Sequence, residues 1–244
     1  MQKLRYVALL DVLKREIREL PPNTVLPTEQ QIAKRFDVSR VTVRRALDLI
    51  ERAGMVSRAR GRGTIVSPPK VIRNMVPFTM LEEDFRQQGV VLETEVLDFQ
   101  VKAELPELVR ELLRLKVGAT AGRIGLLRRI ADRVICLEHR YMPTRIARRF
   151  DPAQVHLRPV LEQVQQLAGK PVTSFSWDME FLPATDFAAA LLGITPGVTS
   201  LVSTSTEYLG DGAPVHVNHA WYRLDHVRFR FSVDQWRMPK RTER

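Results

Sequence analysis

Apolar residues that recur every three or four positions predict a helix over about residues 2–20. Proline cannot continue the backbone hydrogen bonding of a helix, so the pair Pro21-Pro22 should end it. The apolar stripe consists of Tyr6, Leu9, Leu10, Leu13, Ile17 and Leu20. Charged residues interrupt this segment, which the apolar core of a signal peptide would not tolerate. We therefore expect an amphipathic helix rather than a targeting sequence.

Two shorter helices should follow, separated by a tight turn. Thr28 and Gln31 have the spacing of a capping box, in which each side chain bonds to the backbone of the other residue. Ser39 can cap the next helix, and Val38 and Val43 have the spacing of a hydrophobic staple. The buried stripe of this third helix is Val43, Ala46, Leu47 and Ile50.

A small hairpin should come next, with strands near residues 55–59 and 64–66. The residues that join them are Arg60, Gly61, Arg62 and Gly63. Glycine allows a turn with positive φ and removes side-chain bulk, while the arginines make the tip cationic. Such a thin cationic tip suits a narrow groove. Three helices and this hairpin predict a winged helix-turn-helix.

Two prolines mark the boundary between two domains. Pro68 and Pro69 favour an extended backbone, so we assign residues 68–77 to a linker. The first domain is then 1–67 and the second 78–244.

The second domain should mix helices with long strands. Thr79 and Glu82 again have capping-box spacing, and Gly89 should close that helix. We expect further helices near 105–115, 145–150, 158–168 and 185–192. Strands are expected near 90–101, 121–130, 134–142, 172–182, 199–209, 214–223 and 227–233, with hairpin turns at Asp132-Arg133 and Gly210-Asp211-Gly212. This order predicts an α+β domain around a mostly antiparallel sheet.

Charge is distributed unevenly along the chain. Residues 1–70 hold 15 lysines and arginines against 7 acidic residues, and the remainder holds 23 against 21. The net charge of +10 is therefore +8 in the first part and +2 in the second. A basic first domain indicates an anionic polymer as its partner, although a solvated basic surface is the alternative.

Several other classes of protein are disfavoured. The single cysteine, Cys136, permits no disulfide within the chain, and no apolar run approaches the ~20 residues of a membrane span. We therefore expect a cytoplasmic protein without membrane contact. The chain has no nucleophile-elbow, Walker A or strand-linked dinucleotide motif, so we expect neither an enzyme nor a cofactor. His216 and His219 are three apart on a predicted strand and should point to opposite faces, which disfavours a metal site.

Two parts of the sequence resemble known domains. LPTEQQIAKRFDVSRVTVRRALDLIERAGMVSRARGRGTIV resembles the winged helix of the GntR family of bacterial transcription regulators. FTMLEEDFRQQG, RRIADRVICLEHRYMP, LLGITPG and YLGDGAPVHVNHAWYRLDHVRFRF make the second domain similar to the UTRA effector-binding domain of the HutC-type subfamily, whose fold resembles chorismate lyase. The resemblance implies a homodimeric repressor that binds a palindromic operator and releases it when a small metabolite binds.

The residues at the start of the third helix are hydroxyls and guanidiniums, which suit phosphates and purine edges. In the family that this chain resembles, positions matching Ser39, Arg40, Thr42 and Arg44 face the major groove, and the hairpin tip reaches the minor groove. Gln30 occupies a position where many relatives have an arginine. The expected DNA-binding residues are Thr28, Gln30, Ser39, Arg40, Thr42, Arg44, Arg45, Arg60, Gly61, Arg62 and Gly63.

The same resemblance implies an effector pocket formed by Phe78, Thr79, Arg129, Glu138, His216 and Tyr222. The chain departs from relatives at Leu127, where an arginine is common, and at His216, where glutamate is common. An arginine in the pocket favours an effector with a carboxylate or phosphate, because guanidinium pairs with either in bidentate geometry. The alternative role for Arg129 is a structural ion pair with Glu138.

Two other functions remain open at this point. A non-specific architectural DNA binder would show affinity set by salt and not by base sequence. An enzyme with an accessory DNA-binding head would turn over a small acid without recognising an operator.

Overall fold

A computed structural model of the 244-residue chain describes residues 2–59, 61, 63–75 and 80–232. The chain forms two compact units. The first holds the described residues up to Val71 together with Leu224–Val227, and the second holds Ile72–Arg223 and the described residues from Arg228 onward. Within these residues, no helix is both long enough and apolar enough to cross a lipid bilayer.

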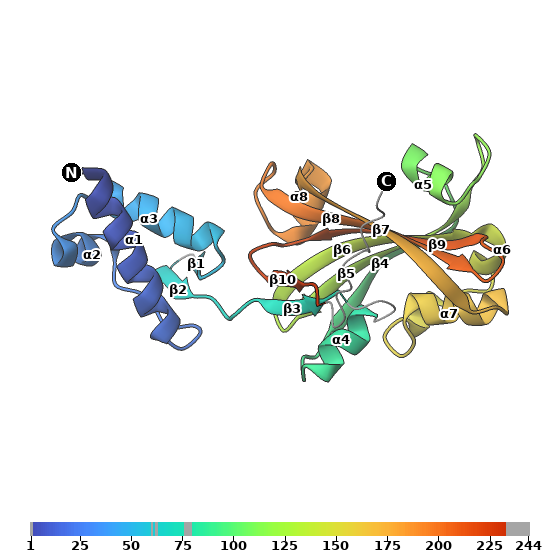
Figure 1. The fold of residues 1–244 in the computed structure, drawn as a ribbon, viewed down its shortest axis with the longest axis horizontal. Helices are drawn as coiled ribbons and strands as arrows, with labels where there is room; N and C mark the ends of the chain where they lie inside the picture. The colour runs from blue at the N-terminus through green and yellow to red at the C-terminus, as the bar shows by residue number, and fades with distance from the viewer. Residues whose placement is uncertain (1, 60, 62, 76–79, 233–244) are drawn as a thin grey trace, which may run out of the picture. The chain divides into compact units, whose positions relative to one another are not determined.

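The first unit is a three-helix domain with a hairpin (Figure 1). Its elements are α1 (Gln2–Glu19), α2 (Glu29–Phe36), α3 (Arg40–Arg52), β1 (Val56–Ala59) and β2 (Gly63–Val66). The predicted capping box is confirmed: Thr28 Oγ1 accepts from the Gln31 backbone at 3.3 Å, and Gln31 Oε1 accepts from the Thr28 backbone at 2.8 Å. Ser39 caps α3 through the backbone N–H of Thr42 at 3.2 Å. These side chains satisfy amide groups that a helix N-terminus otherwise leaves unpaired.

The predicted stripes meet in one core. Val43, Ala46 and Ile50 are fully buried, and residues from all three helices and both strands pack with them. The buried members of this cluster are Leu9, Leu13, Ile17, Leu26, Ile32, Ala33, Val43, Ala46, Leu47, Ile50, Val56 and Val66. This core holds the N-terminus of α3 at the surface of the unit.

The second unit is built on a six-stranded sheet of order β4-β5-β6-β9-β8-β7. All five strand pairs are antiparallel, which confirms the predicted sheet. Its strands are β4 (Glu93–Ala103), β5 (Ala121–Ile130), β6 (Arg133–Pro143), β7 (Val172–Pro183), β8 (Thr199–Leu209) and β9 (Pro214–Tyr222). The helices are α4 (Leu81–Gln87), α5 (Glu107–Leu112), α6 (Thr144–Ala147), α7 (Val160–Ala168) and α8 (Asp186–Leu192), with a short 3₁₀ helix at Pro152–Gln154.

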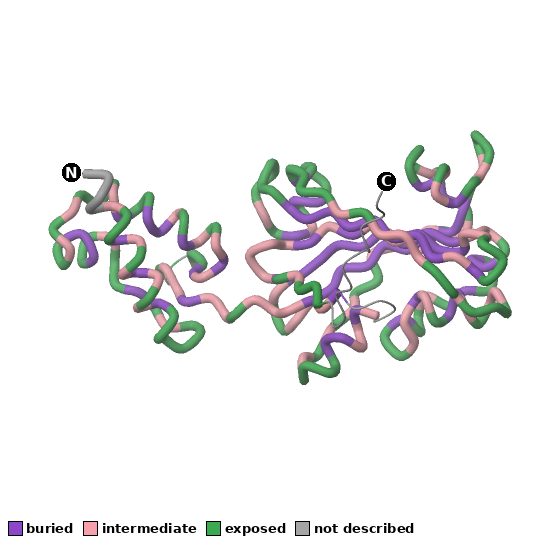
Figure 2. Tube along the Cα trace, viewed as in Figure 1, coloured by how far each residue is buried: buried purple, intermediate pink, exposed green. Residues whose placement is uncertain are grey.

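Helices lie on both faces of this sheet. Figure 1 shows α4 and α7 on one face and α5 and α8 on the other. The central strands β5, β6, β8 and β9 are buried along most of their length, whereas β7 at one edge is largely exposed (Figure 2). Because helices cover both faces of the sheet, the central strands are buried on both sides, including most of the serines and threonines of β8.

Three local expectations were wrong. Residues 68–77 were expected to be a linker, but Val71–Asn74 of that range form β3, which pairs with β10 (Val227–Arg230). Met80, rather than Thr79, precedes α4 and makes no side-chain cap; Thr79 lies outside the described residues. The β5–β6 turn uses Ala131, at φ 53°, with Asp132 instead of Asp132-Arg133. A four-residue strand whose partner lies far along the chain leaves little signal in the sequence, because its hydrogen bonds depend on that distant partner.

Gly122→Ala should destabilise the second unit. A Cβ at this position in β5 would collide with the Cβ of Ala147 in α6. Overpacking of this kind costs about 1–3 kcal/mol. The matched control is Gly210→Ala, where the new Cβ would meet Thr173 at an ordinary 3.6 Å. Urea unfolding followed by tryptophan fluorescence should show a lower midpoint for Gly122→Ala alone; equal midpoints would contradict the close packing of β5 against α6.

Candidate functional site

The N-terminus of α3 presents exposed polar side chains from one short surface. Ser39, Arg40, Arg44 and Arg45 are exposed, and Thr42 is half-buried. The hydroxyls of Ser39 and Thr42 bond to each other at 2.9 Å. This surface offers donors at a helix N-terminus, where the backbone also favours anions.

Arg44 is oriented by a carboxylate from the neighbouring helix. Its Nη2 and Nε donate to Glu29, the first residue of α2, at 3.1 and 3.3 Å. The hydrogen bond and charge of Glu29 raise the pKa of Arg44. Two helices joined by a tight turn therefore set the direction of this guanidinium.

At the tip of the hairpin, the backbone adopts positive φ angles at its two glycines. Gly61 and Gly63 are exposed at φ 76° and 84°, in the left-handed region. Arg60 and Arg62 lie outside the described residues. Arg58 of β1 ties the hairpin to α3: its backbone N–H and its Nη1 donate to Glu51 at 3.1 and 2.8 Å, and its Nη2 pairs with Asp48.

The other residues expected at this surface have distinct positions. Gln30 is exposed on α2, and Thr28 is exposed with its hydroxyl engaged in the helix cap. Val41 was not expected: it is 62% exposed between Arg40 and Thr42. The sequence did contain a signal for this exposure, because Val41 does not fall on the apolar stripe that α3 buries.

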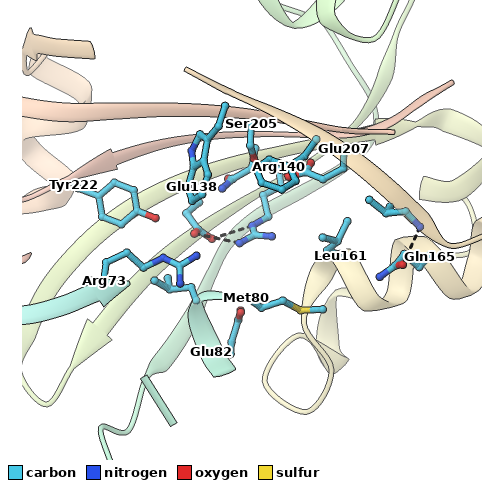
Figure 3. A pocket seen from close by; sticks show the side chains of 15 residues that line it. Arg73, Met80, Glu82, Glu138, Arg140, Leu161, Gln165, Ser205, Glu207 and Tyr222 are labelled. Atoms are coloured by element: carbon cyan, nitrogen blue, oxygen red, sulfur yellow. Dashed lines mark hydrogen bonds and ion pairs between the residues drawn. The ribbon is translucent and has the colours of Figure 1, made fainter. Parts of the chain in front are cut away.

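A cavity of about 340 Å³ lies in the second unit, on the face of the sheet that α4 and α7 cover. In Figure 3, Glu138 and Arg140 lie between Tyr222 on one side and Leu161 and Gln165 of α7 on the other. The lining residues are Arg73, Met80, Leu81, Glu82, Glu138, Arg140, Leu161, Gln165, Val172, Phe175, Trp177, Ser205, Glu207, Asn218 and Tyr222. Its size suits a small metabolite.

Glu138 of β6 is the centre of the buried charges around this cavity. It is fully buried, and its Oε2 accepts from Arg128 Nε and Arg140 Nε, both at 2.9 Å. Arg140 Nη2 reaches Oε1 at 3.2 Å. Burial alone would raise the pKa of Glu138, but the two arginines outweigh burial and lower the pKa to about 2. The carboxylate is therefore ionised at physiological pH.

Arg128 connects this centre to α4. Its Nη2 donates to Glu82 at 2.7 Å, and its Nη1 donates to the hydroxyl of Thr94. Burial would raise the pKa of Glu82, but Arg128 and then Arg140 lower it. The N-terminal turn of α4 is thus held to the sheet by a salt bridge at the edge of the cavity.

Asp84 of α4 forms a second buried cluster with β3. Its Oδ2 accepts from the backbone of Asn74 at 2.8 Å and from Arg73 Nη1 at 3.1 Å. Its Oδ1 accepts from the amide of Asn74 at 2.7 Å. Gln88, one turn later, donates to the carbonyl of Ile72 at 2.7 Å. Strand β3 and helix α4 are therefore joined by several polar contacts.

Glu207 of β8 differs from the other carboxylates around the cavity because it pairs with no guanidinium among the described residues. Ser205 Oγ donates to its Oε1 at 2.7 Å, and His216 Nδ1 lies 2.7 Å from its Oε2. Burial would raise the pKa of Glu207, but His216, Ser205 and Arg140 together lower it.

Strand register explains how these residues share one face. Directly opposite residues in antiparallel strands point to the same side of a sheet. One row across β6, β9, β8 and β7 is Arg140, Asn218, Ser205 and Trp177. The next row is His216, Glu207 and Phe175. The floor of the cavity is therefore polar towards β6 and aromatic towards β7.

The structure brings together only part of the expected pocket. Glu138 and Tyr222 line the cavity, and burial raises the pKa of Tyr222. His216 is buried behind Glu207 instead of lining the cavity. Phe78 and Thr79 lie outside the described residues.

Arg129 does not line the cavity and does not pair with Glu138. It lies half-exposed and pairs with Glu95 at 3.4 Å. Side chains alternate along β5, so its neighbour Arg128 points to the cavity side. The strand register shifts between these two arginines, and such an irregularity is not visible in the sequence.

The histidines expected on opposite faces do lie apart. His219 bonds to the hydroxyl of Thr204 at 2.9 Å and pairs across strands with His139, whereas His216 bonds to Glu207.

The sequence analysis did not identify three charged residues that line the cavity: Arg73, Arg140 and Glu207. Arg140 could have been found, because it follows Glu138 by two residues on a strand and so shares its face.

Comparison with known proteins bears on both sites. The family described as bacterial regulatory proteins, gntR family, matches residues 5–66, and the UTRA domain family matches residues 87–228. The transcriptional repressor NagR of Bacillus subtilis is 27% identical over 94% of this chain and 95% of its own. MngR of Escherichia coli, the repressor of a mannosyl-D-glycerate transport/metabolism system, is 24% identical over 92% of this chain and 93% of its own.

Solved structures share the fold. The crystal structure of PhnF from Mycobacterium smegmatis aligns with a TM-score of 0.59 at 22% identity, over 92% of this chain and 98% of that one. At this level of identity the likeness concerns the fold.

Glu138→Gln should destabilise the protein strongly, because it removes the carboxylate that pairs with buried Arg140 and leaves buried Arg128 with Glu82 alone. Removing one partner of a buried ion pair costs about 3–5 kcal/mol. The matched control is Glu95→Gln, which removes the surface partner of Arg129 and should change little. Thermal and urea unfolding at neutral pH would measure both.

The pH dependence provides a further check on Glu138. Its pKa is about 2 in the folded protein against an ordinary 4.5, so its stabilising effect is present above the ordinary value and declines as pH falls towards 2. The stability gap between wild type and Glu138→Gln should narrow over that range. A constant gap would contradict the ionised buried carboxylate.

Proposed function

Because this chain belongs to the gntR family of bacterial regulatory proteins and carries a UTRA domain, we propose that it is a homodimeric repressor whose palindromic operator is released when a small anionic metabolite fills the cavity. The chain is a DNA-binding transcription regulator rather than an enzyme. Repression, dimerisation, operator symmetry and the charge of the effector are parts of the proposal. The observation that carries it is the exposed N-terminal surface of α3 in one unit combined with a cavity lined by buried charged residues in the other.

Base recognition is proposed for the start of α3 and for the hairpin tip. Arg40 and Arg44 are suited to guanine edges, and Thr42 and the backbone near Ser39 to phosphates. Gln30, Arg45 and Thr28 would contact the flanking backbone. Gly61 and Gly63, with their neighbouring arginines, would enter the minor groove.

The orientation of Arg44 favours specific over architectural binding. A non-specific binder needs only mobile positive charge, whereas Arg44 is held against Glu29 by three hydrogen bonds. A guanidinium whose direction is set before binding loses less side-chain entropy when it meets a base. A homodimer is proposed because one small module contacts too few bases to stand out among the non-specific sites of a genome.

The anionic effector is proposed from Arg140. Its Nε and Nη2 bind Glu138, while its Nη1 makes no hydrogen bond among the described residues. Arg140 lines the cavity and is 8% exposed, so a carboxylate or phosphate there would meet a desolvated donor.

Coupling between effector and DNA is proposed to run through α4 and β3. Leu81 and Glu82 of α4 line the cavity, and Asp84 on the same helix holds Asn74 of β3. Strand β3 follows the winged helix directly in the chain. A ligand that binds one position of α4 better than another would therefore bias β3.

Arg44→Ala should weaken operator binding about ten- to a hundredfold and relax base preference at the positions it reads. Affinity selection from genomic fragments followed by footprinting would define the operator, and fluorescence anisotropy would compare the two proteins on it. Lys34→Ala, which removes an exposed cation of α2 outside the predicted set, is the control. If the affinity of the wild-type protein for DNA depends only on salt concentration and no footprint appears, the protein is a non-specific architectural DNA binder and the proposal is wrong.

Asp84→Asn should separate ligand binding from DNA release. The substitution keeps the shape of the side chain but removes the charge that accepts from Arg73 and Asn74. We expect the ligand to stabilise the variant thermally as it does wild type, while higher ligand concentrations are needed to release the operator. Glu83→Gln, on the exposed side of α4, is the control. Unchanged release by Asp84→Asn would exclude this route of coupling.

A further inference from the structure

We propose that the effector is a zwitterion, with its anionic group at Arg140 and Asn218 and an ammonium group at Glu207 beside Phe175 and Trp177. This inference rests on the proposed regulatory function and adds a cationic group to the effector. It follows from the balance and placement of charges around the cavity.

The charges around the cavity do not favour a purely anionic ligand. Three carboxylates, Glu82, Glu138 and Glu207, line it against two guanidiniums, Arg73 and Arg140. Arg128 behind the wall adds one positive charge and Asp84 one negative charge, so among these described residues the carboxylates outnumber the guanidiniums by one. The carboxylate in excess is Glu207, whose nearest titratable partner is the imidazole of His216 at 2.7 Å. A cavity selective for anions alone would be expected to carry excess positive charge.

Most of these charges are already paired. Arg128 and Arg140 share Glu138, Arg128 also holds Glu82, and Arg73 holds Asp84. In the part of the chain that the structure describes, Glu207 is the carboxylate without a guanidinium, and its partners are a serine hydroxyl and an imidazole. A buried carboxylate that has an imidazole but no guanidinium beside it is stabilised further by a cation that a ligand supplies.

The anionic end has two groups directed to the same place. Arg140 offers Nη1, and Asn218 lies directly opposite Arg140 on the adjacent strand. Asn218 Oδ1 is buried without a hydrogen-bond partner in the described part of the chain. The two amide atoms of asparagine can exchange places, so Asn218 can donate to a ligand oxygen.

The cationic end combines a carboxylate with aromatic rings. Phe175 lies directly opposite Glu207 in the strand register, and Trp177 lies two residues further along the same face. The two rings meet edge to face with centroids 5.9 Å apart. Ammonium groups bind favourably against aromatic faces, and more strongly where water is excluded. Each oxygen of Glu207 also retains acceptor capacity beyond its one internal bond.

The strand geometry sets the span of the ligand. Arg140 and Glu207 are two strands and one two-residue step apart, so their Cα atoms are separated by about 12 Å. Both side chains extend into the same cavity, which leaves a shorter distance between their charged ends. A short flexible chain with opposite charges at its ends fits this distance.

Matched probes can test this assignment directly. The zwitterions are γ-aminobutyrate, δ-aminovalerate and ε-aminocaproate, and each is compared with the alkanoate and the alkylamine of the same length. Thermal shift of the full-length protein at millimolar concentration is the first readout, and calorimetric titration is the second. At least one zwitterion should stabilise wild type more than its matched acid and amine together.

Variants locate the ammonium site. Glu207→Gln should weaken binding of that zwitterion at least tenfold and leave binding of the matched alkanoate unchanged. Phe175→Leu keeps an apolar side chain, removes the ring, and should act in the same direction. The control is Glu180→Gln, which removes an exposed carboxylate from β7, the strand that carries Phe175, and should not change zwitterion binding.

The outcomes separate this inference from the proposed function. Three results would each refute the assignment of the effector as a zwitterion. They are alkanoates that bind as well as the zwitterions, equal binding of the zwitterion to wild type and Glu207→Gln, and no thermal shift with any zwitterion. A footprinted operator combined with any of these results leaves the regulator intact and removes only the ligand class. Zwitterion binding without any operator would support the ligand class and refute the proposed function.

Discussion

One buried carboxylate organises the effector unit. Glu138 is removed from water in the middle of β6, and a charge in that position is tolerated only with close counter-charges. Arg140 supplies one from the same strand, and Arg128 supplies the other from β5. Because Arg128 also holds Glu82, the same network fixes the start of α4 over the cavity. The cavity wall and its electrostatics therefore depend on one group of buried ions.

Such a network has a consequence for regulation. Buried ion pairs contribute little net stability compared with apolar packing, but they are sensitive to any change in their partners. A ligand that approaches Arg140 or Glu82 enters a cluster whose members are already coupled. Asp84, two residues after Glu82, joins the same helix to β3 through the backbone of Asn74. Helix α4 thus contacts the cavity through Glu82 and contacts β3, the strand that follows the winged helix, through Asp84.

The first unit works by simpler means. Side-chain caps at Thr28 and Ser39 start two helices, an apolar core fixes their crossing, and Glu29 holds Arg44 at the surface. Each of these interactions joins residues at most fifteen positions apart, or belongs to an apolar stripe of regular period. That locality is why the helices, their caps and the hairpin could be predicted closely.

The order of most elements, the antiparallel sheet and the exposed polar surface at the start of α3 were determined by the sequence itself, because capping residues and apolar periodicity act over a few residues. The tertiary structure alone decided the cavity. Arg128 and Arg129 are adjacent and chemically alike; alternation along β5 sends one to each face, and only the paired sheet shows that Arg128 meets Glu138 and Arg129 meets Glu95. Arg140, Asn218, Ser205 and Trp177 come from four strands and form one row only after the sheet has paired. Contacts of this kind depend on register between distant segments, which no local pattern of residues specifies.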